Sequence, residues 1–439
     1  MHERFHYASL DEVRAEAARL GLDLPLSQNL GVLRQPLDLS GHTLANRLTI
    51  QPMEGCDGTA AGAPDELTQR RYERFALSGA SLLWFEAIAV VPEGRANPRQ
   101  LYMHEGSVDA FRALNERVRS LAEQRFGFAP LLIAQLTHSG RYSKPEGKPA
   151  PLIGWNNPYL EGDKPLASSC ILSDDDLAAL PERFAQAARL SERAGFDGAD
   201  IKCCHRYLLS ELLSCRERPG RYGGSLENRM RLLRECVQAA KAAVSPGFLI
   251  TCRLNLHDHF PYPYGFGVSQ ESGEEPDLSE SKRVVSLLHE ELGLELLDFT
   301  IGNPYSNPHV NRPYDLGAYR PPEHPFQGLQ RMMDCVGQVK AAFPSLKVIG
   351  SAFSYLRQFS GNLAAGAVER GVCDLAGFGR MAFAYPQFAA DLLEKGALEK
   401  GRCCVACGKC SQLMRMGSRT GCVVRDPEFT NLYKELTKK

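Results

Sequence analysis

The chain has 439 residues, of which 44% are hydrophobic and 23% charged, and its formal net charge is −1. Such a chain can bury a large core without disulfides, and its near-neutral charge argues against a nucleic-acid partner. No apolar run reaches the roughly eighteen residues of a membrane span, and the charged N-terminal stretch lacks the apolar core of a secretory signal. We therefore expect a cytoplasmic protein with no membrane partner.

The predicted elements begin with an amphipathic, helical extension over residues 1–30. Eight short runs follow that are almost continuously apolar, as strands covered on both faces are. These runs are residues 48–53, 81–90, 131–136, 197–202, 248–254, 295–301, 347–351 and 374–379. Helical patterns lie between them, including one that begins at Ser173 and others at residues 225–244, 279–292, 328–343, 360–370 and 386–394.

Eight successive strand-then-helix units predict a (β/α)8 barrel, the TIM-barrel fold, over residues 31–400. The alternative is a doubly wound open sheet, which is less favoured because no strand–GxGxxG–helix unit occurs. Three long irregular segments, at residues 143–170, 257–276 and 303–326, interrupt the pattern. Because each follows a strand, we expect them at the C-terminal face of the barrel, where barrel enzymes carry their active sites.

A candidate catalytic group follows the fourth predicted strand. Lys202, His205 and Tyr207 stand where the strand opens into a loop, so their side chains can converge over the barrel mouth. Two donors and a phenol suit a substrate oxygen that gains negative charge, with Tyr207 as the proton donor. The structural alternative is a strand end with an extended lysine and a packed tyrosine.

The most specific motif lies near the C-terminus, in residues 401–439. Cys404, Cys407, Cys410 and Cys422 follow the spacing C-x2-C-x2-C-x11-C. Three closely spaced thiols and a distant fourth are typical of a [4Fe–4S] cluster, whereas structural zinc more often takes two separated C-x2-C pairs. Buried thiols without metal are the remaining alternative. Cys403 adjoins the first position and competes with Cys404 as ligand. The other cysteines lie in apolar helix and strand patterns and are expected in the core.

Several motifs together resemble the Old Yellow Enzyme family of FMN-dependent oxidoreductases. The cysteine segment is similar to that of its iron–sulfur branch, which includes 2,4-dienoyl-CoA reductase, trimethylamine dehydrogenase and bile-acid enone reductases. The resemblance extends from about Asn46 to Pro427 and lacks the further dinucleotide-binding region of the longest members. It rests on Asn46–Met53, Arg71-Tyr72, Gln135–Arg141, Lys202–Tyr207, Tyr222–Arg229 and Gly379-Arg380.

The resemblance implies roles for individual residues. Pro52, Met53 and Glu54 would line the flavin edge, and Ala87 would pack near the isoalloxazine. Gln135 would hydrogen-bond the pyrimidine edge, and Arg253 would face N1 and O2 of the reduced flavin. The phosphate would be held by Gly350, Ser351, Gly379 and Arg380. Lys202 and His205 would polarise a substrate carbonyl, and Tyr207 would protonate the α-carbon.

Two positions depart from the family pattern, since Lys202 replaces a usual histidine and Arg206 a usual glycine. The lysine favours a substrate that carries a carboxylate or thioester. The implied activity is reduction of the C=C bond of an α,β-unsaturated acid, thioester or ketone. The alternatives are an amine-type dehydrogenase that passes electrons outward, and an electron-transfer subunit whose partner performs the chemistry. NAD(P)H is a candidate external reductant, an electron-donor or electron-acceptor protein a candidate partner, and a homo-oligomer a candidate assembly.

Overall fold

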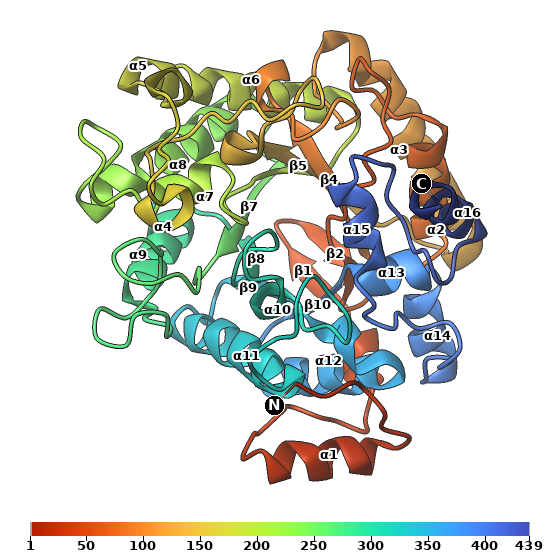
Figure 1. Cartoon of the computed structure of the whole chain (residues 1–439). Coiled ribbons are helices and arrows are strands. Elements are labelled where there is room, and N and C mark those ends of the chain that lie inside the picture. The colour runs from red at the N-terminus through yellow and green to blue at the C-terminus, as the bar shows by residue number, and fades with distance from the viewer. Residues whose placement is uncertain (1, 439) are drawn as a thin grey trace.

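The computed structural model describes residues 2–438, and its centre is a closed barrel of eight parallel strands (Figure 1). The barrel closes where β10 pairs in parallel with β3, so that Phe378 lies opposite Ile50. All eight predicted strands are confirmed. They are β3 (Leu48–Ile50), β4 (Leu82–Ala89), β5 (Leu131–Thr137), β6 (Gly198–Ile201), β7 (Leu249–Asn255), β8 (Leu296–Thr300), β9 (Lys347–Gly350) and β10 (Leu375–Phe378).

The major helices pack around the barrel and bury their apolar faces against the strands. They are α2 (Glu66–Ala76), α3 (Val108–Phe126), α6 (Leu180–Arg193), α8 (Leu226–Ala243), α9 (Ser279–Ser286), α11 (Pro325–Ala342), α12 (Ser360–Glu369) and α14 (Phe388–Lys395). The shorter helices are α4 (Pro158–Glu161), α5 (Asp174–Ala178), α7 (Leu208–Leu212), α10 (Pro308–Asn311) and α13 (Arg380–Ala384). None of the described helices is long and apolar enough to cross a membrane.

Two predicted helices differ from the observed ones. The helix expected from Ser173 is divided into α5 and α6 because Pro181, which has no N–H, stands in the first turn of α6. The helix expected over residues 279–292 is α-helical only as α9, and a π-helical turn over Leu287–Glu291 completes it.

A hairpin that the sequence patterns did not predict precedes the barrel. It comprises β1 (Leu37–Leu39) and β2 (His42–Leu44), which pair antiparallel. Leu37, Leu39 and Leu44 pack with residues at the N-terminal ends of the barrel strands, including Leu82 and Leu375. The hairpin therefore covers the end of the barrel opposite to the expected active site.

The C-terminal segment lies along one side of the barrel. It contains α15 (Lys409–Arg415) and α16 (Pro427–Thr437), which Figure 1 shows beside α13 and α2. Asp426 precedes α16 and is buried, and it accepts hydrogen bonds from Arg70 and Arg74 of α2. The Thr420 N–H donates to the Gly55 carbonyl at 2.6 Å, so the segment also contacts the loop after β3.

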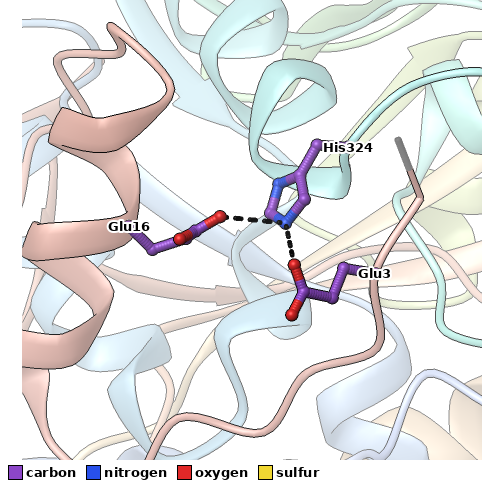
Figure 2. A group of neighbouring side chains, drawn as sticks. All are labelled: Glu3, Glu16 and His324. Carbon is purple, nitrogen blue, oxygen red and sulfur yellow. Dashed lines mark ion pairs between the residues drawn. The ribbon is translucent and has the colours of Figure 1, made fainter.

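The N-terminal segment is held against α11 by a group of three side chains (Figure 2). His324, at the start of α11, faces Glu3 at 3.9 Å and Glu16 of α1 (Leu10–Arg19) at 3.7 Å. These side chains form the only trio of potential metal ligands within 4.8 Å of one another in residues 2–438. However, His324 Nδ1 accepts the Phe326 N–H, so the proton of the neutral ring is on Nε2 and faces the carboxylates. The group therefore links the N-terminus to α11 rather than offering a lone pair to a cation.

Candidate active site

A cavity opens at the C-terminal ends of the barrel strands, and the predicted site residues converge on it. Gln135 and Arg253 belong to β5 and β7, and Arg380 begins α13, whereas the other predicted residues that reach the cavity stand in the loops directly after their strands. The predicted residues that line the cavity are Pro52, Met53, Glu54, Gln135, Lys202, His205, Tyr207, Arg253, Ser351, Gly379 and Arg380. Residues far apart in the sequence thus share one site because parallel barrel strands end at the same face.

Ala87 and Gly350 do not line this cavity. Ala87 is buried in β4, and its carbonyl accepts a hydrogen bond from Gln100. A Cβ at Gly350 would come within 2.9 Å of Cys373 Sγ, so packing outside the barrel favours glycine there. The neighbouring Ser351 and Ala352 line the cavity instead. The flavin contacts expected of Ala87 and Gly350 remain predictions.

Tyr207 is the centre of a hydrogen-bonded group inside the cavity. Its hydroxyl donates to Glu54 Oε1 at 2.9 Å and lies 2.9 Å from the hydroxyl of Tyr305. Lys202 Nζ lies 3.6 Å from the centre of the Tyr207 ring and 3.9 Å from Glu54 Oε1. Burial, reinforced by the negative charge of Glu54, raises the pKa of Tyr207 well above 10. Tyr207 therefore keeps its proton at neutral pH.

His205 enters the cavity from a turn that is uncommon for residues with a side chain. His205 has a φ of 63° and Arg206 a φ of 56°, both in the left-handed region that favours glycine. A glycine, which the family resemblance leads one to expect at position 206, would adopt this conformation without strain. Burial and the nearby charges of Arg253, Lys202 and Arg312 lower the pKa of His205 well below 6.5, so its imidazole is neutral.

Two buried carboxylates hold the polar groups on the barrel wall. Asp200 accepts hydrogen bonds from Gln135 at 2.7 Å and from Trp84 at 2.9 Å. Asp298 lies 3.0 Å from Arg253 Nε, and burial raises the pKa of Asp298 to about 7. Gln135 and Arg253 are therefore fixed in orientation while they line the cavity.

A second, smaller cavity contains the four predicted metal ligands. Cys404, Cys407, Cys410 and Cys422 all line it. Cys403 does not, because it is buried and its thiol donates to the Glu399 carbonyl. The fold thus groups Cys404, rather than Cys403, with the other three thiols.

Comparison with known proteins identifies the family. Residues 32–264 match the NADH:flavin oxidoreductase / NADH oxidase family. The chain belongs to this family. An NADPH dehydrogenase of Bacillus pumilus is 32% identical over 213 residues, which cover 47% of this chain and 59% of that protein. A metal reductase of Desulforamulus reducens is 28% identical over 236 residues, covering 53% of this chain and 34% of that protein. The chain therefore spans only part of the length of these relatives.

Solved structures with the same fold cover most of this member of the NADH:flavin oxidoreductase family. A 2-naphthoyl-CoA reductase superposes with a TM-score of 0.72 at 18% identity, over 92% of this chain and 58% of that one. Histamine dehydrogenase from Rhizobium sp. 4-9 superposes with a TM-score of 0.69 at 22% identity, over 92% of this chain and 53% of that one. An old yellow enzyme homologue from Zymomonas mobilis superposes with a TM-score of 0.63 at 22% identity, over 84% of this chain and 94% of that one.

The cavity of this family member fits the flavin that the family name implies. A fixed amide, Gln135, and a fixed cation, Arg253, suit the polar edge of an isoalloxazine. Among the described residues no carboxylate pairs with Arg380, which donates to the Pro313 carbonyl at 3.0 Å. Arg380 follows β10 and lies with Ser351 and Gly379, a position where barrels bind phosphate.

The two cavities are adjacent. Arg380 and Cys410 line both of them. Ser411, Met414 and Thr420 also reach the larger cavity from the C-terminal segment. A flavin in the larger cavity and a metal cluster in the smaller one would therefore be neighbours.

Tyr305 and Arg312 also line the larger cavity, although the sequence analysis did not select them. Both stand in the irregular segment after β8, where no helical or strand periodicity marks individual positions. The only sequence signal was the length of that segment.

Proposed function

We propose that this oxidoreductase is an FMN- and [4Fe–4S]-dependent ene-reductase that reduces the C=C bond of an α,β-unsaturated acid, thioester or ketone. The observation that carries the proposal is the convergence of Lys202, His205 and Tyr207 on the cavity that also contains Gln135, Arg253 and Arg380. Bound FMN would supply hydride to the β-carbon of the substrate.

The side chains of the cavity would supply the rest of the chemistry. Lys202 and neutral His205 would donate to the substrate carbonyl oxygen, which gains negative charge when the β-carbon accepts hydride. Each such donor is worth about 3–4 kcal/mol of transition-state stabilisation. Tyr207, protonated at neutral pH, would transfer its proton to the α-carbon and recover one through Glu54 or Tyr305.

The residues proposed to hold the cofactors follow from their places in the two cavities. Pro52, Met53 and Glu54 would lie along the flavin edge, and Ser351, Gly379 and Arg380 would hold its phosphate. Cys404, Cys407, Cys410 and Cys422 would bind the [4Fe–4S] cluster, which exchanges electrons singly with an outside donor. That donor would be an electron-carrier protein, or NAD(P)H acting on the flavin directly.

One observation favours oxidation of an amine as the second candidate. Glu54 lies beside the phenol rings of Tyr207 and Tyr305, and Tyr142 stacks on Tyr305 at 3.9 Å. A carboxylate among aromatic rings can bind an alkylammonium ion. Lys202, however, already lies over the Tyr207 ring at 3.6 Å. We therefore favour an electron-poor alkene over a cationic substrate.

The decisive experiment uses protein purified without air. The visible spectrum, flavin content and iron content test the cofactors. Reduced protein is then mixed with enones, enoates and enoyl thioesters, and reoxidation with formation of the saturated product supports the ene-reductase. Bleaching of oxidised protein by amines alone would support the second candidate.

The Tyr207→Phe variant tests the assignment of the proton donor. It should retain FMN and lose about 10²- to 10⁴-fold in turnover, the usual contribution of general acid catalysis. Full activity would remove Tyr207 from the mechanism. If Lys202, His205 and Tyr207 could all be replaced without effect in a complex with a partner, the chain would be an electron-transfer subunit instead.

A further inference from the structure

The segment that carries the four predicted cluster ligands has an uneven charge. Residues 401–425 contain no aspartate or glutamate, but they contain the five cations Arg402, Lys409, Arg415, Arg419 and Arg425. The whole chain, in contrast, has a formal net charge of −1. The next carboxylate along the chain, Asp426, is buried and already pairs with Arg70 and Arg74. The segment therefore concentrates positive charge on a nearly neutral protein.

Most of these cations have no ionic partner in the protein. Arg402 is the exception, because it lies 3.3 Å from Asp391. Among residues 2–438 no carboxylate forms an ion pair with the other four cations. Arg415 and Arg419 are also exposed to solvent, and their side chains donate no hydrogen bond within the described part of the chain. Their charge is therefore available to a binding partner.

The proposed cluster has a counter-charge of its own inside the protein. Four thiolates outweigh the positive iron–sulfur core, so a bound cluster is anionic. Arg380 is buried and lines the smaller cavity together with the thiols, so it offsets part of that charge. Arg415 and Arg419, in contrast, are exposed, where their charge attracts an approaching partner over about 10 Å at moderate salt.

Exposed apolar side chains accompany the cations. Leu316, Met416 and Val424 are 45%, 50% and 40% exposed. Val424 lines the smaller cavity with the four thiols, and Met416 directly follows α15. The Leu316 N–H donates to the carbonyl of Ala406, which stands between the first two predicted ligands. Apolar side chains bordered by charged ones are typical of surfaces that bind another protein.

These residues define a surface that we call the cluster face. It comprises Leu316, Lys409, Arg415, Met416, Arg419 and Val424. The four cysteines that line the smaller cavity are themselves partly exposed. A protein bound to the cluster face would therefore approach the proposed cluster from outside and leave the substrate cavity free.

We propose that the cluster face binds a small, acidic protein that carries single electrons. This inference rests on the proposed function and selects such a carrier over NAD(P)H as the source of electrons. Each bound carrier would give one electron through the cluster, so two carriers in succession supply the electron pair that one alkene consumes. The two protons that complete the saturated product come from water. Opposite charges on the two proteins would speed their encounter.

Binding of acidic carriers to protein purified without air tests the inference without any turnover. Calorimetric titration with a ferredoxin and with a flavodoxin, both of strongly negative net charge, is compared with titration by cytochrome c, a basic carrier. At least one acidic carrier should bind, and its affinity should fall roughly tenfold or more between low and physiological salt, because salt screens exposed charges. Cytochrome c should not bind. Absence of binding by both acidic carriers, or equal binding of cytochrome c, would overturn the proposal.

Charge reversal assigns the binding to the cluster face. Arg415→Glu combined with Arg419→Glu should weaken binding of the acidic carrier by about tenfold or more and slow reduction of the protein by the reduced carrier to a similar extent. Lysine at both positions should preserve the affinity because both charges remain. The matched control is Arg183→Glu combined with Arg189→Glu on α6, where both arginines are exposed and form no ion pair with a described residue. The control should change the affinity by less than about threefold.

The variants can also contradict the assignment. Equal weakening by the two charge reversals would show an effect of net charge alone and overturn it. Iron and flavin contents are measured in every variant, and glutamine replaces glutamate at Arg415 and Arg419 if the reversal lowers either content. Binding of the wild type to vesicles of anionic phospholipid, with no binding of either acidic carrier, would assign the cluster face to a membrane surface instead.

The inference and the proposed function can fail separately. If alkenes are reduced with a chemical reductant while neither acidic carrier binds, the proposed reaction stands and the docking surface is wrong. If a carrier binds and reduces the protein but no alkene is reduced, the docking surface stands and the proposed reaction is wrong.

Discussion

Arg206 Nη1 lies 2.7 Å from Asp258 Oδ2, and both side chains are almost completely buried. Arg206 also donates to the Tyr264 carbonyl, while Asp258 accepts from Asn255. The pair joins the turn after β6 to the long loop after β7. It holds Arg206 in the left-handed conformation that directs His205 into the cavity.

The first prediction concerns this ion pair. Arg206→Gly would relieve the backbone strain but leave the Asp258 charge buried and unpaired, so we expect the free energy of unfolding to fall by about 3–5 kcal/mol. Adding Asp258→Asn should recover much of the loss because the buried charge is then removed. Urea unfolding of the two single variants and the double variant measures the coupling. Strictly additive losses would show that the pair is not coupled.

The second prediction concerns the proton donor. Burial first, and then the charge of Glu54, raises the pKa of Tyr207. Glu54→Gln removes that charge, so the pKa of Tyr207 should fall. Because activity requires the protonated phenol, the alkaline limb of the kcat/KM profile should move to lower pH. Glu146→Gln, at an exposed position, is the control. If the alkaline limb of the Glu54→Gln profile does not move, the charge of Glu54 does not control the protonation of Tyr207 during turnover.

The third prediction distinguishes two neighbouring thiols. Serine at Cys404, Cys407, Cys410 or Cys422 should remove most of the iron and the visible absorption of the cluster in protein purified without air. Cys403→Ser should keep both, because the Cys403 thiol lies outside the shared cavity. Iron loss from Cys403→Ser together with retention in Cys404→Ser would reverse the assignment.

The fourth prediction concerns the attachment of the C-terminal segment. Asp426 is buried between Arg70 and Arg74 of α2 and caps α16. Asp426→Ala should destabilise the packing of this segment by about 1–3 kcal/mol, since it removes the cap of α16 and the hydrogen bonds with two partly exposed arginines. Limited proteolysis should then cleave residues 401–426 faster than in the wild type. Glu428→Ala, an exposed change in the same helix, should leave the cleavage rate unchanged.

The fifth prediction is a pH dependence of stability. His138 is buried, and burial lowers its pKa to about 4, compared with 6.5 when exposed. Between these values the unfolded chain binds a proton that the folded chain does not, so folding stability falls as the pH is lowered from about 6.5 to 4. Replacing His138 with Asn, which can still accept the Gly140 N–H, removes this contribution.

The free energy of unfolding is compared as a function of pH between the wild type and His138→Asn. The difference between the two slopes isolates the contribution of His138 from that of the other titrating groups. The free energy of unfolding of His138→Asn should fall less steeply with decreasing pH than that of the wild type, by up to about 1.4 kcal/mol per pH unit. Urea unfolding at pH 7, 5.5 and 4.5 measures both slopes. Parallel slopes would mean that His138 is protonated equally in the folded and unfolded states.

The sequence predicted the barrel well because its strands are short apolar runs covered on both faces. It missed the β1–β2 hairpin, whose strands have three residues each, too few for a periodic pattern. The dipeptide Ser40-Gly41, both with positive φ, was the available turn signal.

The site residues that could be predicted from the sequence are those that stand at the C-terminal ends of the barrel strands. Lys202, His205 and Tyr207 could be selected because parallel strands bring their C-terminal ends to one face. Tyr305 and Arg312 could not, since their loop has no periodicity and only the closed fold brings them to the cavity. Glu54 was expected along a flavin edge, and its hydrogen bond with Tyr207 depends on contacts that no local pattern encodes.

The larger cavity is completed by residues that are synthesised after the barrel. Cys410, Ser411, Met414 and Thr420 form part of its wall although they follow all eight strands of the barrel in the chain. A polypeptide that contains the barrel alone leaves the cavity open on that side. The proposed flavin would therefore be enclosed only after residues 401–420 have been synthesised and have docked on the barrel.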